Sequence, residues 1–195
     1  MGCAVGSSRG RNSDTVTSFI ALLRGINVGG HNKIAMADLR ALAERLGLRE
    51  PRTILQSGNL VFMSKPQTAG KLEQMLEREL KQQLSLDVSF MVRTAAEWDA
   101  LIARNPYTEA ARRDPGRLVV MCFKEPPDPK AVKVLRGAIE GRETFIAAGK
   151  QAYIVYPDGQ GRSKFTLALI ESKLGTRGTA RNWNTVLKLA ALTSR

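Results

Sequence analysis

Two glycines, Gly25 and Gly30, have the spacing found in phosphate-binding loops. They follow an apolar stretch typical of a strand, and a predicted helix comes after them. A P-loop also needs a lysine directly after the second glycine, to reach the phosphates, and then a serine or threonine that holds magnesium. His31 and Asn32 stand at those two positions. Nucleotide hydrolysis is therefore disfavoured, and the simpler interpretation is that the glycines allow a chain reversal with positive φ.

His31 is the single histidine of the chain, so a metal site built from several histidines is excluded. Any mechanism that needs an imidazole base would depend on this one residue. The two cysteines, Cys3 and Cys122, have neither metal-ligand nor redox spacing. No pair of carboxylates shows the contrasting environments that acid/base catalysis requires. We therefore expect no metal and no cofactor, and the sequence assigns no catalytic residue.

A second polar motif lies where a tight turn is predicted, at Gln56 to Asn59. In a β-α-β-β unit the loop after the first strand and the hairpin between the next two strands share one end of the sheet. The two motifs are thus predicted to form one polar, cationic rim that would bind an anion or a phosphate group. The candidate ligand-binding residues are Arg24, Gly25, Asn27, Gly29, Gly30, His31, Asn32, Lys33, Gln56, Ser57, Gly58 and Asn59.

A structural alternative to this pocket stays open. The amide and hydroxyl side chains would then satisfy backbone groups of the two tight turns, and Arg24 would hold the C-terminal segment in place.

Positive charge is concentrated near the C-terminus. The formal net charge is +12, and residues 161–195 hold seven basic residues against one acidic residue. Such a cluster attracts polyanions through a field that does not depend on sequence. The alternative is a solvated surface that only improves solubility. The predicted basic surface consists of Arg162, Lys164, Lys173, Arg177, Arg181 and Lys188.

The elements that position the rim follow from hydrophobic periodicity. Strands are predicted over residues 17–23, 52–56, 60–63 and 87–92, with helices over 36–46 and 72–84. This order, β-α-β-β-α-β, is the split βαβ or ferredoxin-like arrangement.

The second half repeats most of that order. Thr94 and Glu97 form a capping box before a helix, a strand is expected over 117–123, and Asp128 caps a helix to about residue 139. A hairpin joins strands 143–148 and 152–156, and Ser163 is expected to open the next helix. Asn182 suits the N-cap of a last helix, whose apolar stripe contains Trp183, Val186, Leu187, Ala190 and Ala191. This half is expected to end in that helix where the first half has its fourth strand.

Several of these stretches resemble a known family. The motifs Leu22 to Gly30, Asn32–Lys33 and Gln56 to Asn59 are similar to the opening of the domain-of-unknown-function family 1697. Ser163 to Phe165 and Arg181 to Leu189 look like its C-terminal signature. The resemblance runs over about residues 17 to 192. It implies an α+β fold of two ferredoxin-like subdomains with antiparallel sheets and an extra C-terminal helix, and it implies no activity.

The domain organisation follows from these predictions. Residues 1–16 are expected to form a disordered leader, and residues 17–93 the first subdomain. Residues 94–116 would connect it to the second subdomain, residues 117–195. No stretch resembles a signal peptide or reaches the apolar length of a membrane span, so we expect a cytoplasmic protein with no membrane partner.

Three functions remain open on this basis. The first is noncatalytic binding of a phosphate-bearing small molecule or a nucleic acid through a cationic surface. The second is an enzyme acting on a small anionic substrate at the rim from Gly25 to Lys33 and Gln56 to Asn59, with His31 as its base. The third is a protein-interaction module. The sequence leaves the oligomeric state open.

Overall fold

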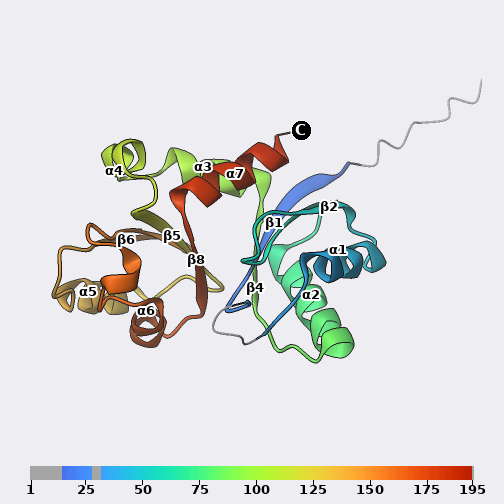
Figure 1. Ribbon diagram of the computed structural model, residues 1–195, viewed down its shortest axis with the longest axis horizontal. Coiled ribbons are helices and arrows are strands. Elements are labelled where there is room, and N and C mark those ends of the chain that lie inside the picture. The colour runs from blue at the N-terminus through green and yellow to red at the C-terminus, as the bar shows by residue number, and fades with distance from the viewer. Residues whose placement is uncertain (1–14, 28–31, 195) are drawn as a thin grey trace, which may run out of the picture.

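The computed structural model describes residues 15–27 and 32–194, and this part of the chain contains two four-stranded antiparallel sheets (Figure 1). The first sheet has the order β2-β3-β1-β4. Its elements are β1 (Thr17–Leu23), α1 (Met36–Arg45), β2 (Arg49–Thr53), β3 (Asn59–Ser64), α2 (Ala69–Leu84) and β4 (Phe90–Thr94). The first half is therefore ferredoxin-like, as predicted. The predicted leader lies, up to residue 14, outside the described residues.

The second sheet has the equivalent order, β6-β7-β5-β8. Its elements are β5 (Leu118–Phe123), α5 (Pro129–Gly137), β6 (Thr144–Ala148), β7 (Gln151–Val155), a short 3-10 helix η1 (Gln160–Arg162), α6 (Leu167–Leu174) and β8 (Gly178–Asn182). Both halves of the described chain thus have the complete ferredoxin-like topology, which confirms the α+β fold class.

Three further helices connect or close the two halves. They are α3 (Ala95–Ala103), α4 (Thr108–Arg113) and α7 (Trp183–Thr193). In Figure 1, α3 and α7 lie together across the top of the molecule between the two sheets. Each follows the fourth strand of its half, since α3 comes after β4 and α7 after β8.

The apolar side chains form three clusters that define the layers. One face of the first sheet packs on α1 and α2, and one face of the second packs on α5 and α6. The remaining faces share a central cluster with α3 and α7, which includes Trp98 and Trp183. The indole N–H of Trp98 donates to the carbonyl of Val186 at 3.0 Å, so the two central helices are also joined by a buried hydrogen bond. The two halves therefore share the central cluster.

Three helix starts follow the predicted caps. Thr94 and Glu97 form the complete capping box of α3. The Asp128 side chain accepts from the amides of Lys130 and Ala131, and Asn182 accepts from the amide of Thr185. These side chains satisfy first-turn N–H groups that have no partner inside the helix.

Strand β8 lacks the sequence pattern that predicts a strand. Its residues include Gly178 and Arg181, so neither an apolar run nor an alternation marks it as a strand. It forms because it pairs with β5 along its whole length, from Phe123 opposite Gly178 to Val119 opposite Asn182. The expectation that the second half ends in a helix without a fourth strand is therefore wrong.

Smaller differences lie at the element ends. Thr166, not Ser163, caps α6, and the short helix α4 was not predicted. The strand expected over 52–56 is β2, which ends at Thr53 because the chain turns at Leu55 with a φ of 58°. On α7 the expected stripe residue Leu187 is 45% exposed, and Leu189 is buried in its place.

Candidate functional site

The two polar motifs lie side by side at one rim of the first sheet, as predicted. The amide of Leu23 donates to the carbonyl of Gly58 at 2.9 Å. The Asn27 side chain donates to the carbonyl of Gln56 at 2.7 Å. The loop after β1 and the hairpin between β2 and β3 are thus joined by direct hydrogen bonds.

The two asparagines of the loop support its backbone. Asn27 has a φ of 54°, and its amide also donates to the carbonyl of Ile34 at 3.1 Å while its oxygen accepts from the amide of Ile34 at 3.0 Å. Asn32, with a φ of 47°, donates to the carbonyl of Gly25 at 3.2 Å. Their side chains hold the turn, which is the structural alternative considered for them. The candidates Gly29, Gly30 and His31 lie outside the described residues.

Arg24 binds the second half of the molecule. Its Nε and one terminal nitrogen each donate to a carboxylate oxygen of Glu171 on α6 at 2.6 Å. Glu171 also accepts from the amide of Gly178 at 2.7 Å. Burial alone would raise the pKa of Glu171, but the hydrogen bonds from Arg24 and Gly178 outweigh it, and the pKa is lowered. The structural alternative for Arg24, an anchor for the C-terminal segment, is therefore the role observed.

The hairpin residues Ser57, Gly58 and Asn59 bind Arg181 from β8. Its guanidinium donates to the carbonyl of Ser57 at 2.7 Å and to the carboxamide oxygen of Asn59 at 2.5 Å. Asn59 is fully buried and donates in turn to the carbonyl of Ile54 and to the Ser57 hydroxyl. These three residues thus form part of the contact between the halves.

A shallow hollow remains at this rim, at the start of α1. It is lined by Asn27, Lys33, Ile34, Ala35 and Gln56. Ala35 is the N-cap of α1 and has no side chain that could accept from the first-turn amides. The side chain of Lys33 is exposed and has no hydrogen bond or ion pair with any described residue. The hollow therefore combines a free ammonium group with the positive end of a helix.

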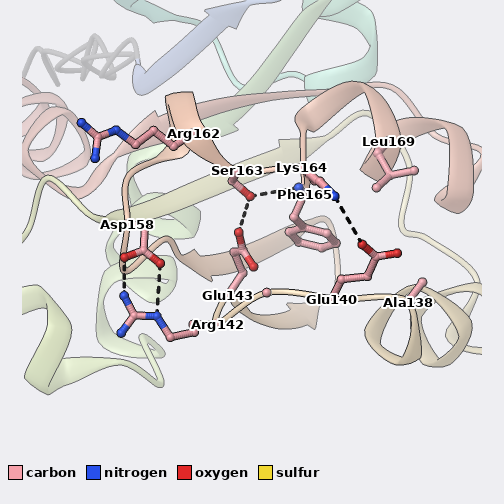
Figure 2. Close-up of a pocket in the computed structure, with 11 residues that line it drawn as sticks. Ala138, Glu140, Arg142, Glu143, Asp158, Arg162, Ser163, Lys164, Phe165 and Leu169 are labelled. Carbon is pink, nitrogen blue, oxygen red and sulfur yellow. Dashed lines mark hydrogen bonds and ion pairs between the residues drawn. The ribbon is translucent and has the colours of Figure 1, made fainter.

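A second hollow lies in the other half, between the α5–β6 loop and the residues that lead into α6 (Figure 2). Its floor includes Phe165, and its rim has three cations and three carboxylates. Arg142 pairs with Asp158, Lys164 lies 4.0 Å from Glu140, and the Ser163 hydroxyl donates to Glu143. The remaining cation is Arg162. Because the charges balance, this hollow does not favour an anion.

The six residues of the predicted basic surface do not lie on one face. Arg181 is only 8% exposed and binds backbone carbonyls, so it does not belong to the surface. Lys173 is on α6 and Lys188 on α7, and these helices pack on opposite faces of the second sheet. The sequence places their charges together, but the fold separates them. Arg162, Lys164, Lys173, Arg177 and Lys188 are exposed.

The described residues offer no metal centre. Within residues 15–27 and 32–194 no three His, Cys, Asp or Glu side chains are grouped to hold a metal ion. Cys122 is a free, fully buried thiol whose pKa is raised by burial. In the same part of the chain no helix has the length and apolar character needed to cross a membrane.

Comparison with known proteins is consistent with this fold. A solved structure described as conserved bacterial protein SP0830 from Streptococcus pneumoniae is similar, with a TM-score of 0.72 and 24% sequence identity over 92% of this chain and 99% of that chain. This likeness concerns the fold alone. No curated protein matches the chain. The family model described as a protein of unknown function, DUF1697, matches residues 16–153, so the chain belongs to the DUF1697 family.

Proposed function

We propose that the protein is a noncatalytic binding protein for a small phosphate-bearing ligand, held in the hollow lined by Asn27, Lys33, Ile34, Ala35 and Gln56. The observation that carries the proposal is the start of α1, where the N-cap Ala35 provides no side-chain cap. The ammonium group of Lys33, which pairs with no described residue, lines the same hollow. Helix N-termini bind phosphate because their N–H groups and the helix dipole both favour negative charge.

Each group in the hollow has a separate role in this proposal. Lys33 supplies a mobile positive charge, and the exposed side-chain amide of Gln56 supplies a donor. Asn27 uses its amide and its oxygen on Ile34 and Gln56, so it fixes the shape of the hollow. The carboxylate of Asp38, in the first turn of α1, partly compensates the positive end of the helix dipole, so a bound phosphate would compete with Asp38 for that charge. With one lysine, the hollow suits a phosphate monoester better than a polyphosphate.

The alternative of an enzyme with an imidazole base depends on His31. This residue lies outside the described residues, and none of the described residues is a histidine. The enzyme alternative therefore stays a prediction from the sequence, whereas the groups that the binding proposal uses are all described.

A thermal-shift titration tests the proposal. Sodium phosphate and AMP are added at ionic strength held constant with sodium chloride. A ligand at a hundredfold excess over its Kd stabilises the native state by about 2.7 kcal/mol, which raises the Tm by roughly 5 to 10 °C for a chain of this size. Lys33→Ala should abolish the shift.

Lys65→Ala is the matched control. Lys65 is also exposed, lies in a loop of the same half, and does not line the hollow. It should leave the shift unchanged. If neither probe raises the Tm, or if Lys33→Ala responds as the unchanged protein does, the proposed site is wrong.

We also infer a cytoplasmic location. The free thiol of Cys122 and the absence of a cysteine pair in the described residues fit a reducing compartment.

A further inference from the structure

The two outer helix layers are equivalent in topology but differ in charge. Helices α1 and α2 of the first half carry five basic and five acidic residues. Helices α5 and α6 of the second half carry four basic residues and one acidic residue. The fold alone does not require this difference, because both layers cover the same kind of sheet.

The excess charge of the second layer lies on its surface. The basic residues are Lys130, Lys133 and Arg136 on α5 and Lys173 on α6, and all four are exposed. None of their side chains forms an ion pair or hydrogen bond with a described residue. The acidic residue Glu171 is bound by Arg24 at 2.6 Å, so it does not neutralise them. Asp128, at the start of α5, is occupied as its N-cap.

Two of the three cations of α5 also line a shallow hollow. Lys133 and Arg136 line it together with Pro129, Val132 and Gly137. Residues three apart on a helix are neighbours on its surface, and Lys130 and Arg136 are about 9 Å apart along the axis. This is a spacing over which one stretch of phosphate backbone can contact all three.

We propose that the exposed face of α5 and α6, which we call the α5–α6 face, binds the phosphate backbone of a double-stranded nucleic acid. The attraction is sequence-independent, because lysine and arginine at a helix surface contact phosphates without reading bases. This surface replaces the one expected from the C-terminal residues, of which only Lys173 lies on these two helices. It is separate from the hollow at Lys33 and does not depend on that proposal.

The exposed apolar side chains argue against two other anionic partners, single-stranded nucleic acids and membrane surfaces. Proteins that bind single strands stack bases on exposed aromatic rings, and no aromatic side chain is exposed in residues 15–27 and 32–194. A helix that binds a membrane surface inserts a face rich in large apolar residues. On the α5–α6 face the exposed large apolar residue is Val134, and Leu135 is buried against the sheet.

Fluorescence anisotropy with labelled 20-base-pair DNA and RNA duplexes tests the proposal. The full chain is titrated at several sodium chloride concentrations. We compare Lys133→Glu/Arg136→Glu with Lys71→Glu/Arg78→Glu, in which two exposed cations of α2 are reversed. Both double variants lower the net charge equally, so only the position of the change differs. Far-UV circular dichroism and the Tm establish that each variant is folded.

The α5 variant should bind at least tenfold more weakly at low salt, and its slope of log K against log salt should be smaller by roughly two. The α2 variant should bind within about threefold of the unchanged protein. The relative affinity for the two duplexes shows whether the backbone is DNA or RNA. Equal losses in both variants would reduce the effect to net charge and overturn the assignment. No binding of either duplex, or binding of phosphatidylserine vesicles in its place, would also overturn it.

Discussion

Arg93 and Arg181 occupy equivalent positions in the two halves, and the guanidinium of each donates hydrogen bonds to the other half. Arg93 on β4 is paired with Ile20 of β1, and Arg181 on β8 is paired with Val120 of β5. Both are buried, at 6% and 8% exposure. Each donates to the end of the first strand and to the hairpin turn of the opposite half. The acceptors are the carbonyls of Phe123 and Lys150 for Arg93, and those of Leu23, Ser57 and Gly58 for Arg181.

A second pair of contacts follows the same rule. The cation after the first strand of each half binds a glutamate on the second helix of the other half. These pairs are Arg24 with Glu171 and Lys124 with Glu77. Each glutamate also accepts an amide from the start of its own fourth strand, Gly178 in one case and Phe90 in the other. The repetition seen in the topology therefore extends to the contacts that join the halves.

Removal of either buried arginine should destabilise the whole protein. Burial lowers the pKa of Arg181 to about 10, which still leaves it charged at neutral pH. Arg181→Ala removes the donor to the carbonyl of Ser57 and to the buried carboxamide oxygen of Asn59, and each such loss costs about 1 to 3 kcal/mol. We expect the free energy of unfolding to fall by roughly 3 to 5 kcal/mol for Arg181→Ala and for Arg93→Ala. Urea unfolding followed by the fluorescence of the buried Trp98 and Trp183 measures this loss.

Arg162→Ala provides the comparison for these variants. The Arg162 side chain is exposed and has no hydrogen bond or ion pair with a described residue. Its replacement should change the free energy of unfolding by no more than about 0.5 kcal/mol. A similar small loss for Arg181→Ala would show that its carbonyl partners are satisfied in another way.

The sequence predicted most of the elements and the shared rim because these depend on local patterns. The period of Leu39 and Leu42 identifies α1, and the β-α-β-β order alone places the two polar motifs at one end of the sheet. The capping box at Thr94 is equally local. Features of this kind need no knowledge of distant contacts.

The partners of the arginines could not be predicted because they are distant in sequence. Arg24 and Glu171 are 147 residues apart, and Arg181 lies 158 residues from Leu23. Arg181 has the charge of a surface residue, and β8 does not show the apolar pattern of a strand. Only the packing of the two sheets shows that this side chain is buried. The α5–α6 face likewise combines two helices that β6, β7 and η1 separate along the chain.

Gly58 should be the least replaceable residue of the hairpin motif. Its φ is 69°, and a Cβ atom there would lie 2.7 Å from the Cβ of Leu23 and 2.7 Å from the Cδ1 of Ile26. Gly58→Ala adds the conformational cost of positive φ, about 1 kcal/mol, to the cost of overpacking, about 1 to 3 kcal/mol. We expect a loss of roughly 2 to 4 kcal/mol in urea unfolding with an unchanged m-value.

Gly47→Ala separates the two costs. Gly47 has a similar φ of 72°, but nothing lies within 4 Å of its Cβ position. This variant should lose about 1 kcal/mol, from the backbone alone. Equal losses of unfolding free energy at both positions would mean that crowding against Leu23 costs nothing. The close approach of the two motifs would then not contribute to stability.

Glu73 on α2 should make the free energy of unfolding fall as pH rises. It is 5% exposed, and burial raises its pKa. The amide of Val92, which donates to it at 2.8 Å, and the charge of Lys124 lower the pKa by less, so the net shift is upward. The folded state therefore binds the proton more tightly than the unfolded state, and the stability gained from this is lost as pH rises through the folded pKa. Glu73→Gln keeps an oxygen for Val92 but removes the charge. It should be more stable than the unchanged protein at pH 7, and the difference should vanish below pH 4.5, the ordinary pKa of the group.

Glu171→Gln should show the opposite sign. The pKa of Glu171 is lowered, so its contribution is present above its ordinary value of 4.5 and is lost as pH falls through the folded pKa. This variant should be less stable than the unchanged protein at pH 7 and should approach it in acid. Urea unfolding between pH 3 and pH 8 measures both differences in one series. If Glu73→Gln lost stability at pH 7 as Glu171→Gln does, the interaction with Lys124 would outweigh burial at Glu73, and the two glutamates would have the same role at the contact between the halves.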